Sequence, residues 1–392
     1  MRIAITSGVR TAIGKFGGTL LNTPAAELSA ITIREALQRS RVQPEELEEV
    51  LIGNVLQAGQ GMNPARQALI KAGIPVTVPA TTINKVCGSG LKAITMGAQA
   101  ISCGDAQIVV AGGTENMSRA PYLLQDARLG YRLGHGELID SMIQEGLTCA
   151  MGDCHMGVTA ENIASRYGIM RSAQDEFSAM SQQRAIAAIA AGKFKREIVS
   201  VPIPQKKGDP KLFDTDEYPR GDTTAESLSK LKPAFQDNGT VTAGNASGIN
   251  DGAAAVVLMS EDTARARNLR PLGYIRSYAS VGVDPAIMGM GPVGAVRKAI
   301  RKADLNLSDI DLFELNEAFA AQSLAVLSQL KLDPERVNIR GGAIALGHPI
   351  GASGARVLVT LLHAMEDHGS RFGLAGLCIG GGQGIAAVVE RE

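Results

Sequence analysis

The 392-residue sequence contains no tryptophan, and aromatic residues make up only 4% of it. Its five cysteines are an odd number and widely spaced, which argues against a disulfide framework and suits a reducing compartment. No apolar run approaches the roughly 20 residues that a membrane span needs. A strand-like segment begins already at Arg2, so we expect no signal peptide. These absences predict a cytoplasmic protein that does not act at a membrane.

The charges also balance, since 39 basic residues face 39 acidic ones. A neutral chain argues against nucleic acid as the main partner, and any phosphate-bearing ligand would need a local cluster of donors. What the chain has in quantity is glycine, 45 residues, and an apolar fraction of 45%. This combination indicates tight turns and close backbone contacts around a large core, and the length predicts two or three domains.

Short apolar segments alternate with amphipathic ones, which favours a layered α/β fold. The predicted strands are Ile3–Thr6, Val50–Ile52, Ile108–Ala111, Asn250–Ser260 and Ile385–Val389. The predicted helices are Ala25–Ser40, Gly88–Ser102, Ala173–Ala191, Val293–Ala303 and Ser353–Asp367.

The chain also repeats itself. Six positions match six others at a constant offset of 263, and these are Arg34, Ala36, Leu37, Arg39, Leu47 and Glu48 against Arg297, Ala299, Ile300, Lys302, Ile310 and Asp311. After one gap Asn54 falls opposite Asn316, and Ser89-Gly90 falls opposite Ser353-Gly354 at an offset of 264. A nearly constant offset predicts two similar α/β halves.

The repeat divides the chain into three parts. Residues 1–118 together with 250–270 form the predicted first half, and residues 271–392 form the second half. Residues 119–249 are richer in charge and turns, which indicates an inserted domain. Asn250–Ser260 is the strand that returns to the first half.

Cys87 lies in the segment NKVCGSGL, where a helix is predicted to open at about Gly88. Exposed N–H groups and the helix dipole at such a site lower a thiol pKa and favour the thiolate. This position indicates a nucleophile, although a lone cysteine is more often a buried structural residue.

Three further residues lie where chain segments change direction. His348 precedes a helix in GGAIALGHPIGASGAR and falls opposite Asn84 in the repeat, so it is predicted to meet Cys87 at the junction of the halves. Cys378 ends a strand before a glycine run whose N–H groups suit an oxyanion. Asn316 lies at a strand-to-helix junction. The alternatives are a loop histidine without function and an asparagine helix cap.

Five segments together resemble the signature blocks of the thiolase family. They are CGSG at 87–90, GNASGINDGAAA at 244–255, NEAFA at 316–320, GGAIALGHPIGASGAR at 341–356 and CIGGGQG at 378–384. The resemblance runs along the whole chain and is greatest to bacterial acetyl-CoA acetyltransferases. It implies a thiolase-like α/β fold of two duplicated five-layered halves with an inserted loop domain.

The same resemblance implies the activity and its residues. Two acetyl-CoA would condense reversibly to acetoacetyl-CoA and CoA, with no cofactor besides the CoA substrate. Cys87 would be the acylated nucleophile, His348 would activate it, and Cys378 would exchange the proton at the second acetyl group. Asn316 would hold a water for the enolate oxygen, and the N–H groups of Cys87 and Gly380 would receive the oxyanion.

Residues that would contact CoA are also implied by the resemblance. They are His155, Met156, Gln183, Arg220, Ser227, Ala243, Ser247, Met288 and Phe319. Met288 and Phe235 would close the acyl pocket around short chains. The segment Leu123–Leu138 resembles a loop through which relatives assemble as homotetramers, although it is equally typical of a solvated surface loop.

Arg340 departs from the family pattern, which has asparagine there, and this change is expected to alter the loop geometry before His348. Four alternatives stay open: a thiolase of broader chain length, a ketosynthase-like condensing enzyme, a non-catalytic acyl-CoA or lipid carrier, and a zinc site. The second thiol at Cys378 favours a thiolase over a ketosynthase. A zinc site would use Cys149, Cys154 and His155, which lack paired C-x-x-C spacing.

Overall fold

The computed structural model describes residues 1–392. A mixed sheet of 11 strands runs through it, in the order β15-β16-β17-β14-β1-β13-β5-β3-β4, with β2 paired to β13 and β10 to β1. The bounds are β1 Ile3–Thr11, β2 Gly14–Lys15, β3 Glu49–Gly53, β4 Ala80–Ile83, β5 Ile108–Asn116, β10 Ile198–Val199, β13 Asn250–Ser260, β14 Gly273–Gly282, β15 Leu312–Leu315, β16 Phe372–Ile379 and β17 Gln383–Glu390. Every predicted strand is confirmed.

The sheet joins two halves of the chain. Strands β1, β13, β5, β3 and β4 belong to the first half, and β14, β17, β16 and β15 belong to the second. The two sets meet only where Ile3–Ile5 pairs with Gly273–Ile275. Strand β13 lies between β1 and β5, so the predicted return of the chain to the first half is confirmed. All but the last residue of β13 are buried, because helices cover both faces of the sheet.

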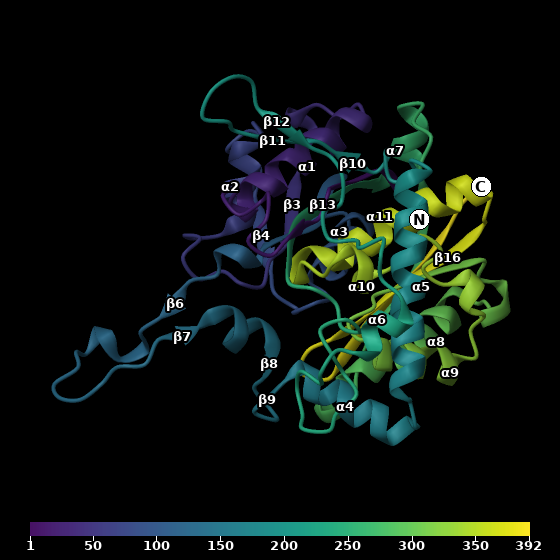
Figure 1. Ribbon diagram of the computed structural model, residues 1–392. Helices are drawn as coiled ribbons and strands as arrows, with labels where there is room; N and C mark the ends of the chain where they lie inside the picture. Colours follow the sequence, from purple (N-terminus) through teal and green to yellow (C-terminus); the bar gives the residue numbers. More distant parts are fainter.

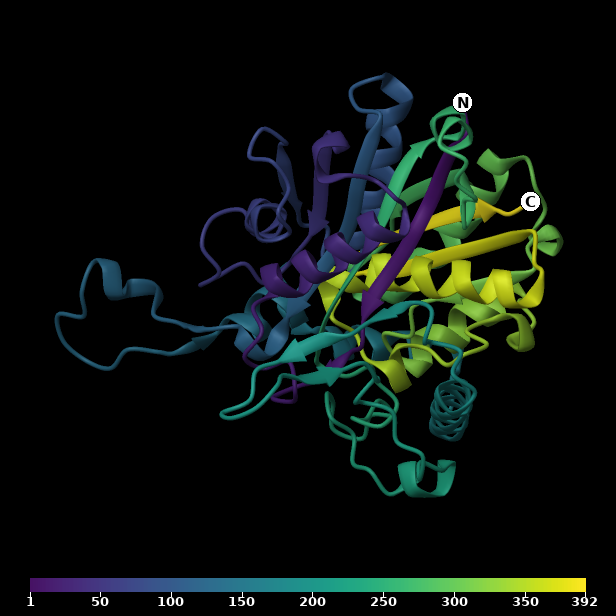
Figure 2. The ribbon, with the colours of Figure 1, turned by 90° about the horizontal axis from the view of Figure 1, so that it is seen from above.

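The helices form three layers around the two sets of strands (Figures 1 and 2). Helices α1 (Ala25–Arg39) and α2 (Pro64–Lys71) cover the outer face of the first set, and α8 (Gly291–Ala303) and α9 (Ala320–Leu330) cover the outer face of the second. Helices α3 (Ser89–Cys103) and α11 (Ile350–His368) lie between the two sets. The five layers therefore belong to both halves together rather than to each half, which corrects that part of the expected fold.

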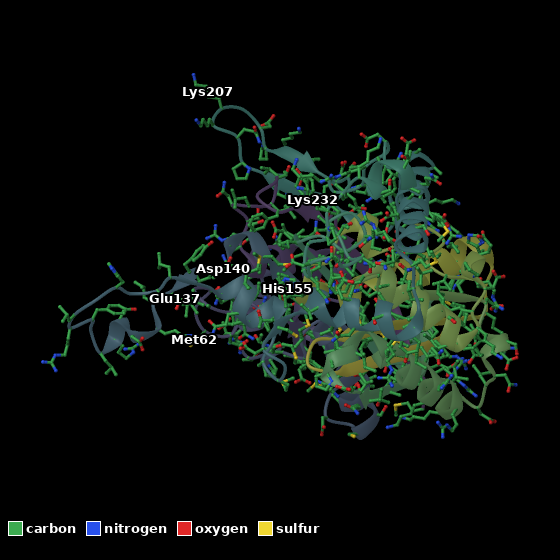
Figure 3. The ribbon with its side chains drawn as sticks, turned by 60° about the horizontal axis from the view of Figure 1, so that its bottom comes forward. Met62, Glu137, Asp140, His155, Lys207 and Lys232 are labelled. Carbon is green, nitrogen blue, oxygen red and sulfur yellow. The ribbon has the colours of Figure 1, made fainter.

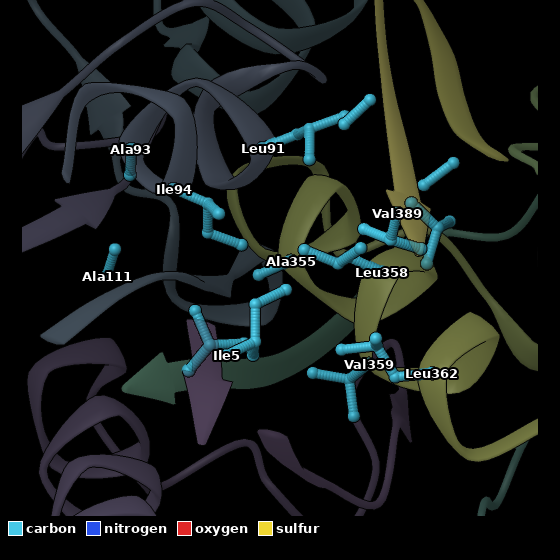
Figure 4. Packing of buried hydrophobic residues seen from close by; sticks show 14 of the residues in the cluster. Ile5, Leu91, Ala93, Ile94, Ala111, Ala355, Leu358, Val359, Leu362 and Val389 are labelled. Carbon is cyan, nitrogen blue, oxygen red and sulfur yellow. The ribbon is translucent and has the colours of Figure 1, made fainter. Parts of the chain in front are cut away.

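The contact between α3 and α11 brings the two halves together. Figure 4 shows Leu91 and Ile94 of α3 beside Ala355 and Leu358 of α11, within one buried cluster of 29 residues. A Cβ atom on Gly354 would lie 2.3 Å from the backbone nitrogen of Leu91. Only glycine permits this approach, and the contact lies near the start of both helices. The fold therefore brings the amino ends of α3 and α11 close together.

The inserted segment carries the remaining helices and hairpins. They are α4 Met156–Tyr167, α5 Arg171–Ala190, α6 Ala225–Ser229, β6 Tyr122–Leu123, β7 Ile139–Asp140, β8 Thr148–Cys149, β9 Cys154–His155, β11 Val201–Ile203 and β12 Lys211–Phe213. Two short helices, α7 (Glu261–Ala266) and α10 (Ala343–Leu346), lie in the halves themselves. None of the helices combines the length and apolar character needed to cross a membrane.

Two hairpins project from the body. The pair β6–β7 forms the base of a long arm, on which Glu137 and Asp140 lie, and Lys207 lies near the tip of the shorter β11–β12 hairpin (Figure 3). Large apolar side chains on the arm are exposed, with Leu129 at 91% and Leu133 at 99% of their full accessible area. Such exposure is unusual for a surface that faces only water.

Candidate active site

A cavity of about 600 Å³ lies where the amino ends of α3 and α11 meet the glycine turn after β16. The side chains or backbones of Cys87, His348, Cys378 and Gly380 all line it. Residues up to 293 positions apart in the chain therefore converge at one site. The predicted meeting of the two cysteines and the histidine is confirmed.

Cys87 lies directly before Gly88, the N-cap residue of α3. The preceding Val86 has a positive φ of 46°, which is strained for a β-branched residue and is typical of functional turns. Burial raises the pKa of the Cys87 thiol to about 11, and the N–H groups of Gly380 and Cys87, which contact the sulfur, lower it by less. The expected lowering of this pKa is therefore wrong, because desolvation of the thiolate outweighs the donors at the helix end.

His348 is held by two neighbours, Asn250 and Ser353. Its backbone N–H donates to Asn250 Oδ1 at 3.0 Å, and its ring Nδ1 lies 2.6 Å from Ser353 Oγ. Ser353 donates its own proton to the Pro349 carbonyl at 2.9 Å, so Oγ accepts from Nδ1–H. This assigns the lone pair to Nε2. Burial lowers the pKa of His348 to about 3, and the nearby Arg356 acts in the same direction. The ring is therefore neutral and available as a base.

Cys378 lies at the end of β16, one residue before the turn that leads into β17. Burial raises the pKa of this thiol, and the nearby Cys87 sulfur raises it further. In the turn, Gly381 and Gly382 have φ of +81° and +84°, and a Cβ on Gly382 would lie 2.3 Å from the Val283 carbonyl oxygen. The glycine run is thus required to fold the turn, and the turn directs the Gly380 N–H toward Cys87.

Asn316 follows β15 and is only 1% exposed. Its Nδ2 atom lies 3.4 and 3.5 Å from the two ring nitrogens of His348, which is long for a hydrogen bond. Its Oδ1 atom is buried and has no protein partner. Helix α9 has Phe319 as its N-cap residue, so the alternative role of Asn316 as a cap is wrong.

Most of the residues expected to contact CoA line the same cavity. They are His155, Met156, Arg220, Ala243, Ser247, Met288 and Phe319. Gln183 and Ser227 do not line it and lie exposed on the surface, where the Ser227 hydroxyl donates to the Thr224 carbonyl within the capping of α6. Asn316 lies behind His348 rather than in the wall.

An aromatic stack forms part of the cavity wall. The Phe235 ring lies parallel to that of His155, with centroids 4.7 Å apart, and it meets Phe319 edge-on at 6.1 Å. A Cβ on Gly157 would lie 2.2 Å from the Phe235 ring. His155 in turn accepts the Gly157 N–H at the start of α4. Phe235 is therefore fixed on two sides, and it narrows the cavity beside Met288.

Family models for the thiolase N-terminal domain and the thiolase C-terminal domain match residues 3–262 and 269–391. The chain belongs to the thiolase family. It is 60% identical to an acetyl-CoA acetyltransferase of Pseudomonas aeruginosa, over 100% of this chain and 99% of the relative. It is 59% identical to an acetyl-CoA acetyltransferase of Escherichia coli, over 99% of this chain and 98% of the relative. The predicted family is confirmed.

Solved structures of the family have the same fold as this thiolase. The Bacillus anthracis acetyl-CoA acetyltransferase superposes with a TM-score of 0.97 at 46% identity, covering 99% of this chain and 98% of that one. Human mitochondrial 3-ketoacyl-CoA thiolase superposes with a TM-score of 0.96 at 43% identity, covering 100% and 98%. The thiolase-like fold is therefore confirmed.

Arg340 of this thiolase does not approach His348. Its guanidinium donates to the carbonyls of Lys193 and His363 and to Asp367 Oδ2, at 3.0, 3.2 and 2.6 Å. Its side chain is 4% exposed, and Glu197 lies 3.8 Å away. The charge is thus balanced within a buried network near the carboxyl end of α11. Arg340 anchors the loop before His348 to that end of the helix, away from the cavity.

Cys149 and Cys154 face each other across the β8–β9 pair, next to the cavity wall. The structure contains no group of three or more His, Cys, Asp or Glu residues placed to hold a metal ion. Cys149 instead packs in an apolar cluster with Met156, Phe319 and Cys378.

Sequence reasoning missed several residues that complete the site. Ser353 orients the His348 ring, Asn250 holds its backbone, and Tyr218 lines the outer cavity. Ser353 and Asn250 lie inside two of the signature blocks, and Ser353 is a polar residue among glycines and alanines. That local contrast was available as a signal, whereas nothing in the sequence near Tyr218 marks it.

Proposed function

We propose that this thiolase is an acetyl-CoA C-acetyltransferase, which joins two acetyl-CoA molecules to acetoacetyl-CoA and CoA and also catalyses the reverse thiolysis. The observation that carries the proposal is the convergence of two thiols and one neutral imidazole on one cavity, beside the Gly380 N–H. Relatives of that name, similar along their whole length, support it.

In the first step His348 Nε2 takes the proton of Cys87 while the sulfur attacks the thioester carbonyl. The resting pair is thiol and neutral imidazole, because the pKa of Cys87 is about 11 and that of His348 about 3, so proton transfer accompanies attack. The N–H groups of Cys87 and Gly380 are the donors for the tetrahedral oxyanion. One such donor is typically worth about 2.7–4 kcal/mol in the transition state.

When the tetrahedral intermediate collapses, the C–S bond to CoA breaks and the CoA thiolate takes the proton of Cys378. The products of this step are acetyl-Cys87, free CoA, a Cys378 thiolate and a protonated His348. Because its pKa is raised, the Cys378 thiolate is a strong base. The proton balance therefore prepares Cys378 for the second half-reaction.

In the second step the Cys378 thiolate takes a proton from the methyl carbon of a second acetyl-CoA. The enolate oxygen is stabilised by protonated His348 and by a water on Asn316, whose Oδ1 has no protein partner. The enolate carbon attacks acetyl-Cys87, and the Cys87 sulfur leaves and recovers its proton from His348. All three residues then return to their starting protonation states.

CoA binding is proposed for the inserted domain, residues 119–249, together with neighbouring parts of both halves. His155, Met156, Ala243, Ser247 and Phe319 would surround the pantetheine arm within the cavity, with Arg220 at its outer part. Gln183 and Ser227, which lie outside the cavity, would contact the nucleotide end. Met288 and Phe235 would limit the acyl chain to short lengths.

Assembly as a homotetramer is proposed through the arm that contains Leu123–Leu138. The exposed side chains of Leu124, Leu129, Leu133 and Leu138 on this arm supply the apolar surface for such a contact. We also propose a cytoplasmic location, where the five free cysteines would stay reduced.

The proposed reaction can be tested by condensation of acetyl-CoA and by thiolysis of 3-ketoacyl-CoA substrates of increasing chain length. Activity confined to four-carbon substrates supports the acetyltransferase, and broad activity would instead favour a general 3-ketoacyl-CoA thiolase. Structural similarity to the human 3-ketoacyl-CoA thiolase makes this comparison necessary.

The roles of the two thiols can be separated with Cys378→Ser. This variant should still be acetylated at Cys87, as seen in the intact protein mass, but should form no acetoacetyl-CoA. Cys103→Ser is the matched control, since Cys103 is exposed and does not line the cavity. Acetoacetyl-CoA formation by Cys378→Ser at the parent rate would contradict the assignment.

A further inference from the structure

The two helices that meet at the site begin in different ways. In the internal repeat Ser89-Gly90 matches Ser353-Gly354, so Cys87 corresponds to Gly351. The N–H of Cys87 contacts the reactive sulfur at the cavity. The N–H of Gly351, in the first turn of α11, instead donates to Glu115 Oε2 at 2.9 Å. One of the two matching donors is thus free for a substrate, and the other is already bound to a carboxylate of the protein.

Glu115 lies near the end of β5 and is wholly buried. It accepts four hydrogen bonds, from Asn54 Nδ2 at 2.8 Å and from the N–H groups of Val55 at 3.1 Å, Leu56 at 3.2 Å and Gly351 at 2.9 Å. No lysine or arginine forms a salt bridge with it. N–H donors and the amino end of a 19-residue helix therefore surround this carboxylate in place of a cation.

Glycines make this contact possible. A Cβ on Gly351 would lie 2.7 Å from Glu115 Oε2 and 2.6 Å from the Thr114 carbonyl oxygen. A Cβ on Gly113 would lie 2.1 Å from the Gly351 carbonyl oxygen. The end of β5 and the first turn of α11 are therefore in direct backbone contact, three residues after His348.

The matching asparagines differ in the same way. Asn54 and Asn316 are partners in the repeat, but Asn54 Nδ2 is bound to Glu115 whereas Asn316 faces the His348 ring. Asn54, Glu115 and Gly351 thus form a closed group on one side of the junction. On the other side His348 and Cys87 line the cavity, and Asn316 lies beside the His348 ring.

We infer that Glu115 is a positioning residue of this thiolase, an internal carboxylate that occupies the N–H donors at the start of α11 and so holds His348 opposite Cys87. The inference rests on the roles proposed above for His348 and Cys87. Burial raises the pKa of Glu115 to about 7, and in its ionised form the carboxylate near the Cys87 sulfur opposes formation of the thiolate until the imidazole takes the proton.

The test uses Glu115→Gln and Glu115→Ala in the full-length protein. In Glu115→Gln an amide NH₂ replaces one of the accepting oxygens and faces N–H groups. We expect kcat for condensation to fall about 10- to 100-fold with KM nearly unchanged, because a displacement of about 1 Å in a reacting group has effects of this size. Thermal unfolding measured in parallel ensures that the assayed protein is folded.

Two readouts separate positioning from a merely structural role. Formate added to Glu115→Ala should restore kcat in a saturable manner, since it can occupy the vacated N–H donors, whereas chloride at equal ionic strength should not. Iodoacetamide should alkylate Cys87 at lower pH in Glu115→Gln than in the parent, because a nearby negative charge is gone. Parent-like kcat in both variants, or reduced kcat with neither formate rescue nor an altered alkylation profile, would overturn the inference.

His348→Ala, assayed beside these variants, distinguishes the two levels of the proposal. If His348→Ala retains activity, the proposed chemistry itself is wrong. If His348→Ala is inactive while Glu115→Gln behaves like the parent, the chemistry stands and only the role of Glu115 is refuted.

Discussion

Helices α3 and α11 share a Ser-Gly turn, a central position and a mutual contact at Gly90 and Gly354, yet their amino ends differ in use. The end of α3 carries Cys87 and opens to the cavity. The end of α11 is closed by Glu115 and presents His348 just before the helix. A duplicated fold supplies two similar sets of N–H donors, and this protein leaves one set open for chemistry while the other fixes the geometry.

The largest effect is expected at the open end. Cys87→Ser should lower condensation and thiolysis by about 10,000-fold or more, because the nucleophile is replaced by a much weaker one. Steady-state rates and the loss of the acetylated protein in mass spectra check this. Cys103→Ser, at the far end of the same helix, should keep parent activity. Strong activity in Cys87→Ser would remove the distinction between the two helix ends.

His348→Ala tests the roles of the histidine that lies just before α11, opposite Cys87. A general base typically contributes 10²- to 10⁴-fold and an oxyanion donor about 10²- to 10³-fold, and the proposed scheme assigns both roles to His348. We therefore expect a loss above about 10,000-fold in the condensation rate. A loss of only about 100-fold would show that another group stabilises the enolate.

Arg340 tests how firmly the other end of α11 is anchored. Arg340→Ala leaves Glu197, which is fully buried, and Asp367 without this partner. Glu197 keeps Arg10, and Asp367 keeps Lys193 and Arg196, so the loss comes mainly from the hydrogen bonds of the buried guanidinium and is expected to be about 3 kcal/mol of unfolding free energy. Denaturant unfolding should show this loss. Arg196→Ala is the control, because that exposed residue also contacts Asp367 and should cost about 0–1 kcal/mol.

The helix contact itself can be tested with Gly354→Ala. The new Cβ would lie 2.3 Å from backbone of α3, which cannot move aside, so we expect a loss of about 3 kcal/mol. Gly97→Ala on α3 should cost less, since its Cβ would meet the flexible Leu258 side chain at 2.9 Å. Equal losses in denaturant unfolding would show that the backbone contact has no special importance.

The smallest effect expected concerns pH. The pKa of His348 is lowered to about 3, so the folded protein keeps a neutral ring that the unfolded chain would protonate below about 6.5. The contribution of the buried neutral ring to the free energy of unfolding is fully present above the pKa of the unfolded chain. It declines as the pH falls, by about 2 kcal/mol between pH 7 and pH 5. His348→Gln should show a correspondingly weaker loss of stability over this range, measured by denaturant unfolding. An identical pH dependence would refute burial of a neutral ring.

The sequence alone predicted the strands β1, β3, β5, β13 and β17, the helices α1, α3, α5, α8 and α11, and the candidate residues. Apolar periodicity and the offset of 263 positions are local or pairwise patterns, so these elements and the division into two halves follow from them. The signature blocks contained Cys87, His348 and Cys378, and the structure brings all three to one cavity. The residues around them were harder to predict from the sequence, since Phe235 and Tyr218 come from irregular parts of the insertion.

Only the tertiary structure decided the electrostatics and the use of each helix end. The direction of the Cys87 pKa shift depends on burial by segments distant in the chain, and the position of Arg340 depends on partners at Lys193, His363 and Asp367. Glu115 lies 236 positions from the Gly351 N–H that it binds. Desolvation and contacts of this kind arise from the packing of remote segments, whereas strand and helix patterns are determined by neighbours in the sequence.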